Sequence, residues 1–206
     1  MDTTTPGRLT RRALRREELP LIWTIDRREL IERIYELRDG RLVLIDARFD
    51  MRGWPPGEAE HAMPWLEASF DRGAMARGVF DGQRLVAVSV LDRVLLGPRR
   101  DLLQLSFLHV GHDHRGLGLG VELFDEAARM ARELGAAGLY VSATPSEHTI
   151  GFYLRRGCRV IDVPDPELFA REPEDIHLEW RPGHAPVSIE GGRDEAIVRR
   201  RARPGR

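Results

Sequence analysis

The sequence predicts an α+β fold, with helices flanking a mixed, mostly antiparallel central sheet. Two β-rich pairs support this prediction: residues 31–37 and 41–45 around Arg38-Asp39-Gly40, and residues 75–80 and 84–91 around Asp81-Gly82. After residue 110 the pattern changes to amphipathic helices that alternate with strands. Early hairpins followed by alternating helices and strands are typical of a mixed sheet covered by helices.

The first half supplies the remaining elements before the second hairpin. Residues 9–14 are expected to form a strand. Residues 17–29 are expected to form a helix, because apolar residues recur at helical spacing. Residues 58–70 also have an apolar helical stripe, in which Pro64 predicts a kink or a break.

The second half begins with a strongly apolar strand over residues 102–110. An amphipathic helix is expected next and ends at Gly135, a residue type that commonly follows the last turn of a helix. The predicted elements are, in order, a helix over 121–134, a strand over 139–143, a helix over 146–156 ended by Gly157, and strands over 158–161 and 176–180.

Length and composition indicate one globular domain with two loose ends. The chain has 206 residues, of which 42% are hydrophobic and 32% charged, and its mean hydropathy is -0.37. These values suit an ordinary soluble protein. Residues 1–7 and the Arg-, Pro- and Gly-rich residues 181–206 are expected to be flexible, leaving a single domain over residues 8–180.

The basic residues exclude two classes of enzyme. All 32 are arginine, so a P-loop NTPase and a Schiff-base enzyme both lack the lysine that they need. This bias suggests a bacterial source with a GC-rich genome. The net charge of -1 gives no general attraction to nucleic acid, and the run Arg199–Arg203 is interpreted as a solvated tail.

Cysteine usage and hydropathy predict a cytoplasmic protein. Cys158 is the only cysteine, which excludes an intramolecular disulfide, and we expect it to be buried in a strand rather than to act as a nucleophile. No apolar run approaches the length of a membrane span. His112, His114 and His148 lack the spacing of a metal site, so no metal is expected.

The chemically informative segment is the glycine-rich turn between the strand at 102–110 and the helix from Val121. Glycines allow successive amide N–H groups to point inward, and the start of the helix adds unpaired N–H groups. A diphosphate is the expected ligand. A Rossmann site fits poorly, because the spacing here is G-x-G-x-G and antiparallel hairpins precede it.

The pattern R-x-x-G-x-G, present as Arg115, Gly118 and Gly120, resembles the GNAT superfamily of N-acetyltransferases. The resemblance covers about residues 75–180. It continues in Ser146–Tyr153, which is similar to the family stretch N-x-x-A-x-x-F-Y. Ser146, Thr149 and Cys158 stand where the family usually has Asn, Ala and Phe, and these departures leave the glycine turn intact.

The resemblance implies a GNAT-like fold, with residues 8–74 on the acceptor side and residues 75–180 forming the acyl-CoA-binding core. It implies acetyl-CoA as co-substrate and Tyr153 as the acid that protonates the departing CoA thiolate. The residues that it assigns to binding acetyl-CoA are Leu108, Val110, Arg115, Gly116, Leu117, Gly118, Leu119, Gly120 and Ser146.

The expected reaction is direct acetyl transfer to a primary amine of a small molecule or peptide. The general base is left open among His109, Asp26, Glu29 and a water chain. Trp54 either lines the acceptor pocket or packs in the core. The alternative function is a non-catalytic CoA-binding sensor, and the resemblance also allows a homodimer.

Overall fold

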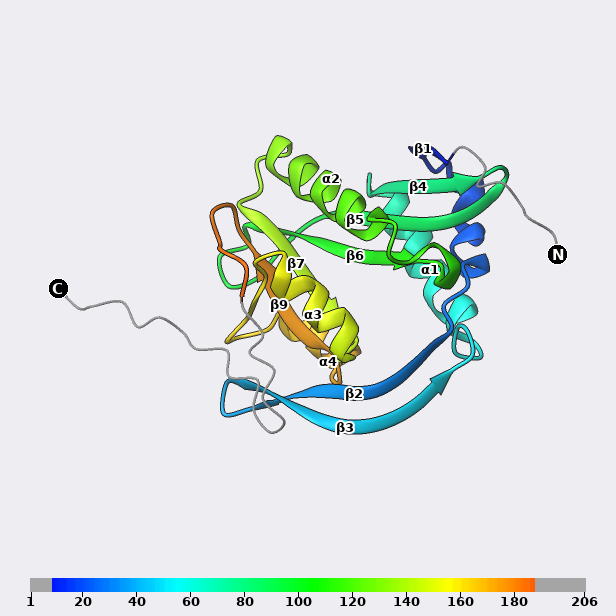
Figure 1. The fold of residues 1–206 in the computed structure, drawn as a ribbon. Helices are drawn as coiled ribbons and strands as arrows, with labels where there is room; N and C mark the ends of the chain where they lie inside the picture. Colours follow the sequence, from blue (N-terminus) through cyan, green and yellow to red (C-terminus); the bar gives the residue numbers. More distant parts are fainter. Residues whose placement is uncertain (1–8, 188–206) are drawn as a thin grey trace. The chain divides into compact units, whose positions relative to one another are not determined.

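The protein, seen in a computed structural model, is described over residues 9–187 (Figure 1). The chain folds as two compact parts. Within the described residues, the first part holds 9–30 and 50–141, and the second holds 31–49 and 142–187. The predictions for residues 1–7 and for most of the tail, from residue 188 onward, lie outside the described range.

The first part is built on a mixed sheet, as the sequence predicted. Its strands lie in the order β1-β4-β5-β6-β7. Neighbours pair antiparallel except β6 and β7, which are parallel. The strands are β1 (Thr10–Ala13), β4 (Met75–Asp81), β5 (Arg84–Leu96), β6 (Leu102–Val110) and β7 (Gly138–Ala143), whose first residues belong here.

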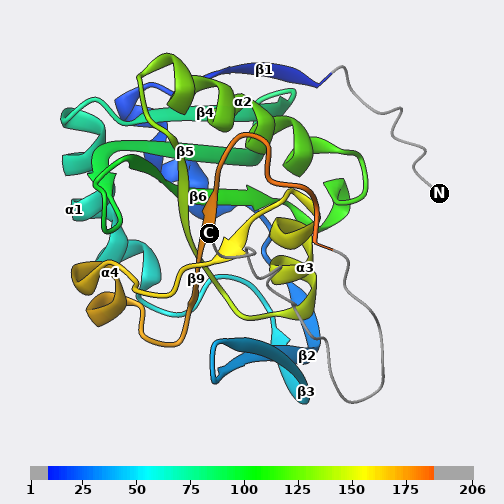
Figure 2. The same cartoon turned by 90° about the vertical axis from the view of Figure 1, so that its left-hand side faces the viewer.

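Helices cover both faces of this sheet (Figures 1 and 2). The 3-10 helix η1 (Arg16–Thr24) and α1 (Glu58–Asp71) share one apolar cluster with β4 and β5, whereas α2 (Leu119–Glu133) packs in a second cluster. Two predictions need correction. The first helix ends at Thr24 instead of residue 29, and Pro64 does not interrupt α1.

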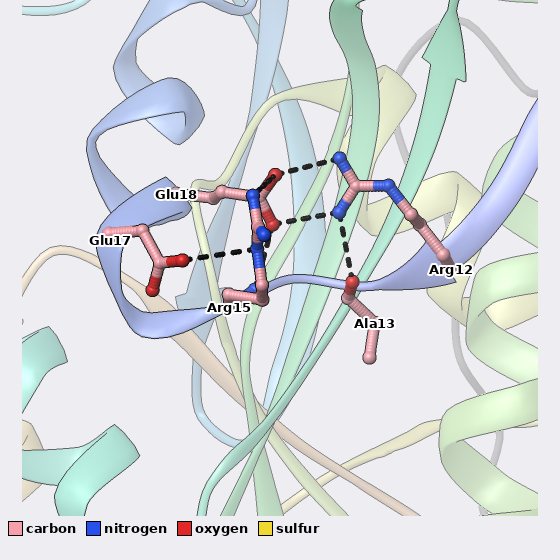
Figure 3. Close-up of polar contacts among 5 residues, drawn as sticks. All are labelled: Arg12, Ala13, Arg15, Glu17 and Glu18. Carbon is pink, nitrogen blue, oxygen red and sulfur yellow. Dashed lines mark hydrogen bonds and ion pairs between the residues drawn. The ribbon is translucent and has the colours of Figure 1, made fainter.

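An arginine–glutamate cluster fixes the corner between β1 and η1 (Figure 3). The buried Glu18 carboxylate accepts hydrogen bonds from the Arg12 guanidinium at 2.7 and 2.8 Å and from the backbone N–H of Arg15 at 2.9 Å. These bonds, the Arg12 pair first, lower the pKa of Glu18 to about 2. Arg12 also lies 3.9 Å over the Phe80 ring, so one charge network joins β1, η1 and β4.

The second part contains a long hairpin and the C-terminal elements. The hairpin strands meet at Asp39 and Gly40, which both have positive φ, as a two-residue turn requires. A short helix, α4, was not predicted, and buried Cys158 lies just before a strand instead of within it. The elements are β2 (Glu29–Arg38), whose first two residues belong to the first part, β3 (Arg41–Met51), whose last two residues do so as well, α3 (Glu147–Arg155), β8 (Arg159–Val160), α4 (Pro166–Arg171) and β9 (Ile176–Trp180).

Candidate functional site

The glycine turn lies between β6 and α2, after the short 3-10 helix η2 (His112–His114). Gly116 and Gly118 have φ angles of 78° and 80°, in the left-handed region that disfavours other residues. A Cβ atom at either position would meet no other atom within 4 Å. Backbone conformation, rather than crowding within the protein, therefore requires glycine here, and the space beside the turn is open.

The backbone N–H groups of the turn are available to a ligand. Over the described residues, no N–H from Gly116 to Val121 donates a hydrogen bond to a protein acceptor, and the first bond of α2 runs from Glu122 N–H to Gly118 O at 3.0 Å. Gly118 caps the helix without a side chain. Free donors at the positive end of a helix dipole form a site for an anion such as a pyrophosphate.

Side chains on either side of these donors keep the helix start in place. Leu119 is buried with Leu123 against Val79 and Val86, while the Leu117 side chain is exposed. The acidic residue of the first turn, Glu122, accepts two hydrogen bonds from Arg11, at 2.5 and 3.0 Å. Its carboxylate is thus bound to arginine, and the N–H groups of the turn have no acceptor among residues 9–187.

The end of β6 has a strand edge that pairs with no other strand among residues 9–187. Pairing between β6 and β7 stops at Gln104 and Tyr140, yet β6 continues to Val110 with β5 on its other side. In that continuation Leu108 pairs with Ser89. An extended ligand containing amide groups can form strand-like hydrogen bonds along such an edge. The predicted residues Leu108 and Val110 therefore lie on this edge, next to the glycine turn.

The Arg115 side chain makes contacts that the sequence did not predict. Its guanidinium forms an ion pair with Glu29 at 3.2 Å, and its Nε donates to the Val110 carbonyl at 3.4 Å. The positive charge expected beside the phosphates is therefore held by a carboxylate at the start of β2. A phosphate ligand would share this guanidinium with Glu29.

The loop before the turn is attached to the segment that enters β2. His112 N–H donates to the Asp26 carbonyl at 2.9 Å, and its Nδ1 lies 3.2 Å from the Arg28 carbonyl oxygen. Arg28 in turn donates to Asp113 at 2.8 Å. Asp26 also pairs with Arg28, at 3.3 Å. Both carboxylates considered as general bases, Asp26 and Glu29, are thus bound to arginines beside the turn.

His109 lies among aromatic side chains on β6. Its ring is 4.8 Å from Trp54 and 5.8 Å from Phe107, centroid to centroid. Burial, followed by the charges of Arg27 and Arg115, lowers the pKa of His109 to about 3. The imidazole is consequently neutral near pH 7 and holds a proton only weakly.

Trp54 has a packing role in the first part. Its ring contacts Trp23 at 4.8 Å, and its Nε1 donates to the Ile25 carbonyl at 3.0 Å. The Arg27 guanidinium lies 4.9 Å from the centre of the Trp54 ring. The buried Nε1 of Trp23 has no hydrogen-bond partner in the part of the chain that the structure describes.

The remaining predicted residues, Ser146 and Tyr153, lie in the second part. Ser146 caps α3: its Oγ accepts from Thr149 N–H at 3.2 Å and bonds to Thr149 Oγ1 at 2.9 Å. Burial chiefly, with Cys158 and Asp175 adding to it, raises the pKa of Tyr153, so the phenol stays protonated. Burial likewise raises the pKa of the Cys158 thiol, which suits an inert cysteine.

Tyr35 is a buried phenol that the sequence analysis missed. Only 2% of it is exposed, and its hydroxyl has no hydrogen-bond partner among residues 9–187. Its backbone N–H donates to Pro145 O at 2.7 Å, and Ile34 forms a β-bridge with Ser146. The inward-facing pattern of β2 predicts burial of Tyr35, but only the fold places it beside the cap of α3.

Among the described residues, no three His, Cys, Asp or Glu side chains are arranged to hold a metal ion. None of the described helices is both long and apolar enough to cross a membrane.

Comparisons with known proteins identify the family. The model of the "Acetyltransferase (GNAT) family" matches residues 31–158, more than half of the chain. A comparison with curated proteins gives no match. Among solved structures, nourseothricin acetyltransferase is 18% identical with a TM-score of 0.59, over 84% of this chain and 98% of that one.

Two further structures share the fold. The PaiA N-acetyltransferase from Thermoplasma acidophilum, in complex with coenzyme A, is 15% identical with a TM-score of 0.55, over 84% of this chain and 99% of that one. The ribosomal-protein-S18-alanine N-acetyltransferase from Escherichia coli is 14% identical with a TM-score of 0.54, over 90% and 99%. The match to the family model, with the mixed sheet and the glycine turn in place, shows that this chain belongs to the GNAT family of acetyltransferases.

Proposed function

We propose that this acetyltransferase moves the acetyl group of acetyl-CoA to the primary amine of a small molecule or peptide. Acetyl-CoA is the co-substrate, as membership of the family implies. The observation that carries the proposal is the run of unpaired N–H groups from Gly116 to Val121 at the start of α2. These donors suit the pyrophosphate of CoA in charge and in direction.

The proposed binding roles are those that the family resemblance implies, and the chain's own geometry supports them. The N–H groups of Gly116 through Gly120 hold the pyrophosphate, and the Arg115 guanidinium, shared with Glu29, adds charge. The backbone of Leu108 and Val110, on the open edge of β6, pairs with the amides of the pantetheine arm. Ser146 supports the start of α3, the helix that carries Tyr153.

The reaction forms one C–N bond and breaks one C–S bond. The amine nitrogen attacks the acetyl carbon, the sulfur leaves as a thiolate, and the attacking nitrogen loses a proton. Tyr153 donates its phenolic proton to the thiolate. The phenol is protonated near pH 7, as a group that donates a proton must be.

The proton lost by the amine is best passed to water. His109 holds a proton weakly at a pKa of about 3, and Asp26 and Glu29 are bound by arginines. Any of these groups can orient a water molecule by accepting a hydrogen bond. We therefore propose a water chain as the route for the proton. We also propose that the reaction takes place in the cytoplasm, where the single cysteine stays reduced.

Replacing the proposed acid tests this mechanism. Tyr153→Phe removes the phenolic proton with little change in volume. We expect kcat to fall by about 100-fold or more, the size of a typical general-acid contribution, while the Kd for CoA changes little. Equal losses in kcat and in CoA affinity would count against an acid role. The matched control is Tyr35→Phe, which removes another buried phenolic hydroxyl.

The alternative, a CoA sensor without catalysis, is separated by a simple pair of measurements. Thiol release from acetyl-CoA in the presence of a panel of primary amines detects the enzyme. A sensor would show thermal stabilisation by CoA and no amine-dependent thiol release with any member of the panel.

A further inference from the structure

The long hairpin of the second part has one covered edge and one open edge. The outer edge of β2 is covered by residues 145 and 146, through the Tyr35–Pro145 hydrogen bond and the Ile34–Ser146 bridge. β3 pairs only with β2 within the described chain. Two-stranded ribbons are marginal on their own, and an open strand edge is a template for another strand.

Two charged side chains on β3 have no ion-pair partner among residues 9–187. Asp46 and Arg48 are both exposed, and neither forms an ion pair with any described residue. The same two-residue spacing does produce ion pairs elsewhere on the hairpin, between Glu36 and Arg38 at 2.6 Å and between Asp50 and Arg52 at 3.0 Å. The spacing therefore permits an internal pair, but Asp46 and Arg48 leave their charges available.

The opposite face of the same stretch is apolar. Ile45, Ala47 and Phe49 alternate with the charged residues and so lie on one face of the strand. Phe49 is 51% exposed, an unusual position for a large aromatic side chain. A strand added at this edge would cover part of that surface.

We propose that the open edge of β3 pairs with β3 of a second copy of this chain, antiparallel about a two-fold axis at Ala47. In that register Asp46 lies opposite Arg48 of the second copy, and the symmetry makes this charge pair twice. On the other face, Ile45 lies opposite Phe49 of the second copy. This interface is separate from the proposed acetyl transfer, and the experiments that test it do not depend on that reaction.

Charge selects this register over its neighbours. An axis at Asp46 would place two aspartates opposite each other, and an axis at Arg48 would do the same with two arginines. Like charges directly opposite destabilise a strand pair, whereas opposite charges and apolar pairs stabilise it. Of the axes at Asp46, Ala47 and Arg48, only that at Ala47 gives two charge pairs and two apolar pairs, with an isologous interface as a two-fold dimer requires. An axis at Phe49 would place Arg48 opposite Asp50 and Asp46 opposite Arg52, but Asp50 and Arg52 already form an ion pair within one chain, at 3.0 Å.

A cysteine placed on the axis tests the register. The one natural cysteine, Cys158, is buried, so an introduced thiol is the accessible one. In Ala47→Cys the two Cα atoms would lie about 5 Å apart, within the range for a disulfide, and oxidation should link the full chain into a dimer. Ile45→Cys, on the same face but off the axis, should stay unlinked. Equal linking of both variants, or of neither, would overturn the register.

Charge reversal tests the interface without new covalent chemistry. By sedimentation velocity on the full chain, Asp46→Arg and Arg48→Asp should each raise the dimer dissociation constant by about tenfold or more, and the double reversal should restore dimerisation. A native chain that sediments as a monomer at about 100 μM, or a dimer indifferent to both single reversals, would overturn the proposal. So would a chain that dimerises only after deletion of residues 188–206, because that segment would then be the occupant of the edge.

Discussion

At the scale of single residues, the unpaired hydroxyl of Tyr35 is the most informative side chain. A buried polar group without a hydrogen bond costs about 1–3 kcal/mol of desolvation that nothing in the described structure offsets. Tyr35→Phe should therefore raise the free energy of unfolding of the ligand-free protein by about 1 kcal/mol, measured by urea unfolding. A loss of stability would mean that the hydroxyl has a partner, and loss of CoA affinity would identify that partner as the ligand.

Through Glu18, the charge cluster of Figure 3 makes the stability of the protein depend on pH. Its pKa in the folded protein, about 2, lies below the ordinary value of 4.5. The stability it contributes is therefore present above pH 4.5 and is lost as the pH falls towards 2. Glu18→Gln should lower the free energy of unfolding at pH 7. It should also make that free energy depend less on pH between 4.5 and about 2, as measured by urea unfolding across the pH range.

The neighbouring glutamate provides the control for that experiment. Among the described residues Glu17 forms an ion pair with exposed Arg15 alone, at 3.1 Å, and is itself largely exposed. Exposed pairs of this kind contribute little to stability. Glu17→Gln should leave the acid limb unchanged, and an equal flattening in both variants would assign the effect to net charge instead of the buried cluster.

At the scale of elements, the glycine turn can be tested against another glycine of similar conformation. Gly118→Ala forces alanine into the left-handed backbone conformation at the cap of α2. This change should lower the free energy of unfolding by about 1–2 kcal/mol. Gly82→Ala imposes the same kind of strain, at φ 60°, in the turn between β4 and β5. Both should lower the melting temperature, but only Gly118→Ala should weaken CoA binding in calorimetry. Equal CoA affinities in the two variants would argue against the turn as the phosphate site.

The sequence predicted most elements because their periodicity is strong. The alternating hairpins and the amphipathic stripe of α2 are local patterns that survive in the fold. Its errors occurred where local patterns are weak: η1 is a tight 3-10 helix that ends before Asp26, and α4 has only six residues. The effect of Pro64 was overestimated, because α1 continues through this residue without a break.

The site was only partly predictable, because several of its contacts join distant segments. The R-x-x-G-x-G pattern located the turn, since conformation and free N–H groups are local properties. The Arg115–Glu29 pair and the placement of Tyr35 beside Ser146 depend on tertiary structure. The low pKa of His109 likewise arises from burial and from two arginines far apart in sequence.

At the scale of the whole molecule, ligand binding should raise stability by mass action. With CoA at about 100 times its Kd, binding to the folded state alone adds about 2.7 kcal/mol. For a chain of this size, 1 kcal/mol corresponds to roughly 2–4 °C, so we expect the melting temperature to rise by about 5–10 °C. Differential scanning calorimetry across a CoA titration measures this shift.

Pantetheine, which lacks the pyrophosphate and the nucleotide, separates the two proposed binding elements in the same experiment. It can still pair with the open edge of β6 but offers nothing to the N–H groups of the turn. We expect a much smaller shift than with CoA at equal concentration, and a CoA shift that falls in Gly118→Ala but not in Gly82→Ala. If pantetheine raised the melting temperature as much as CoA does, most of the binding energy would come from the strand edge and not from the glycine turn.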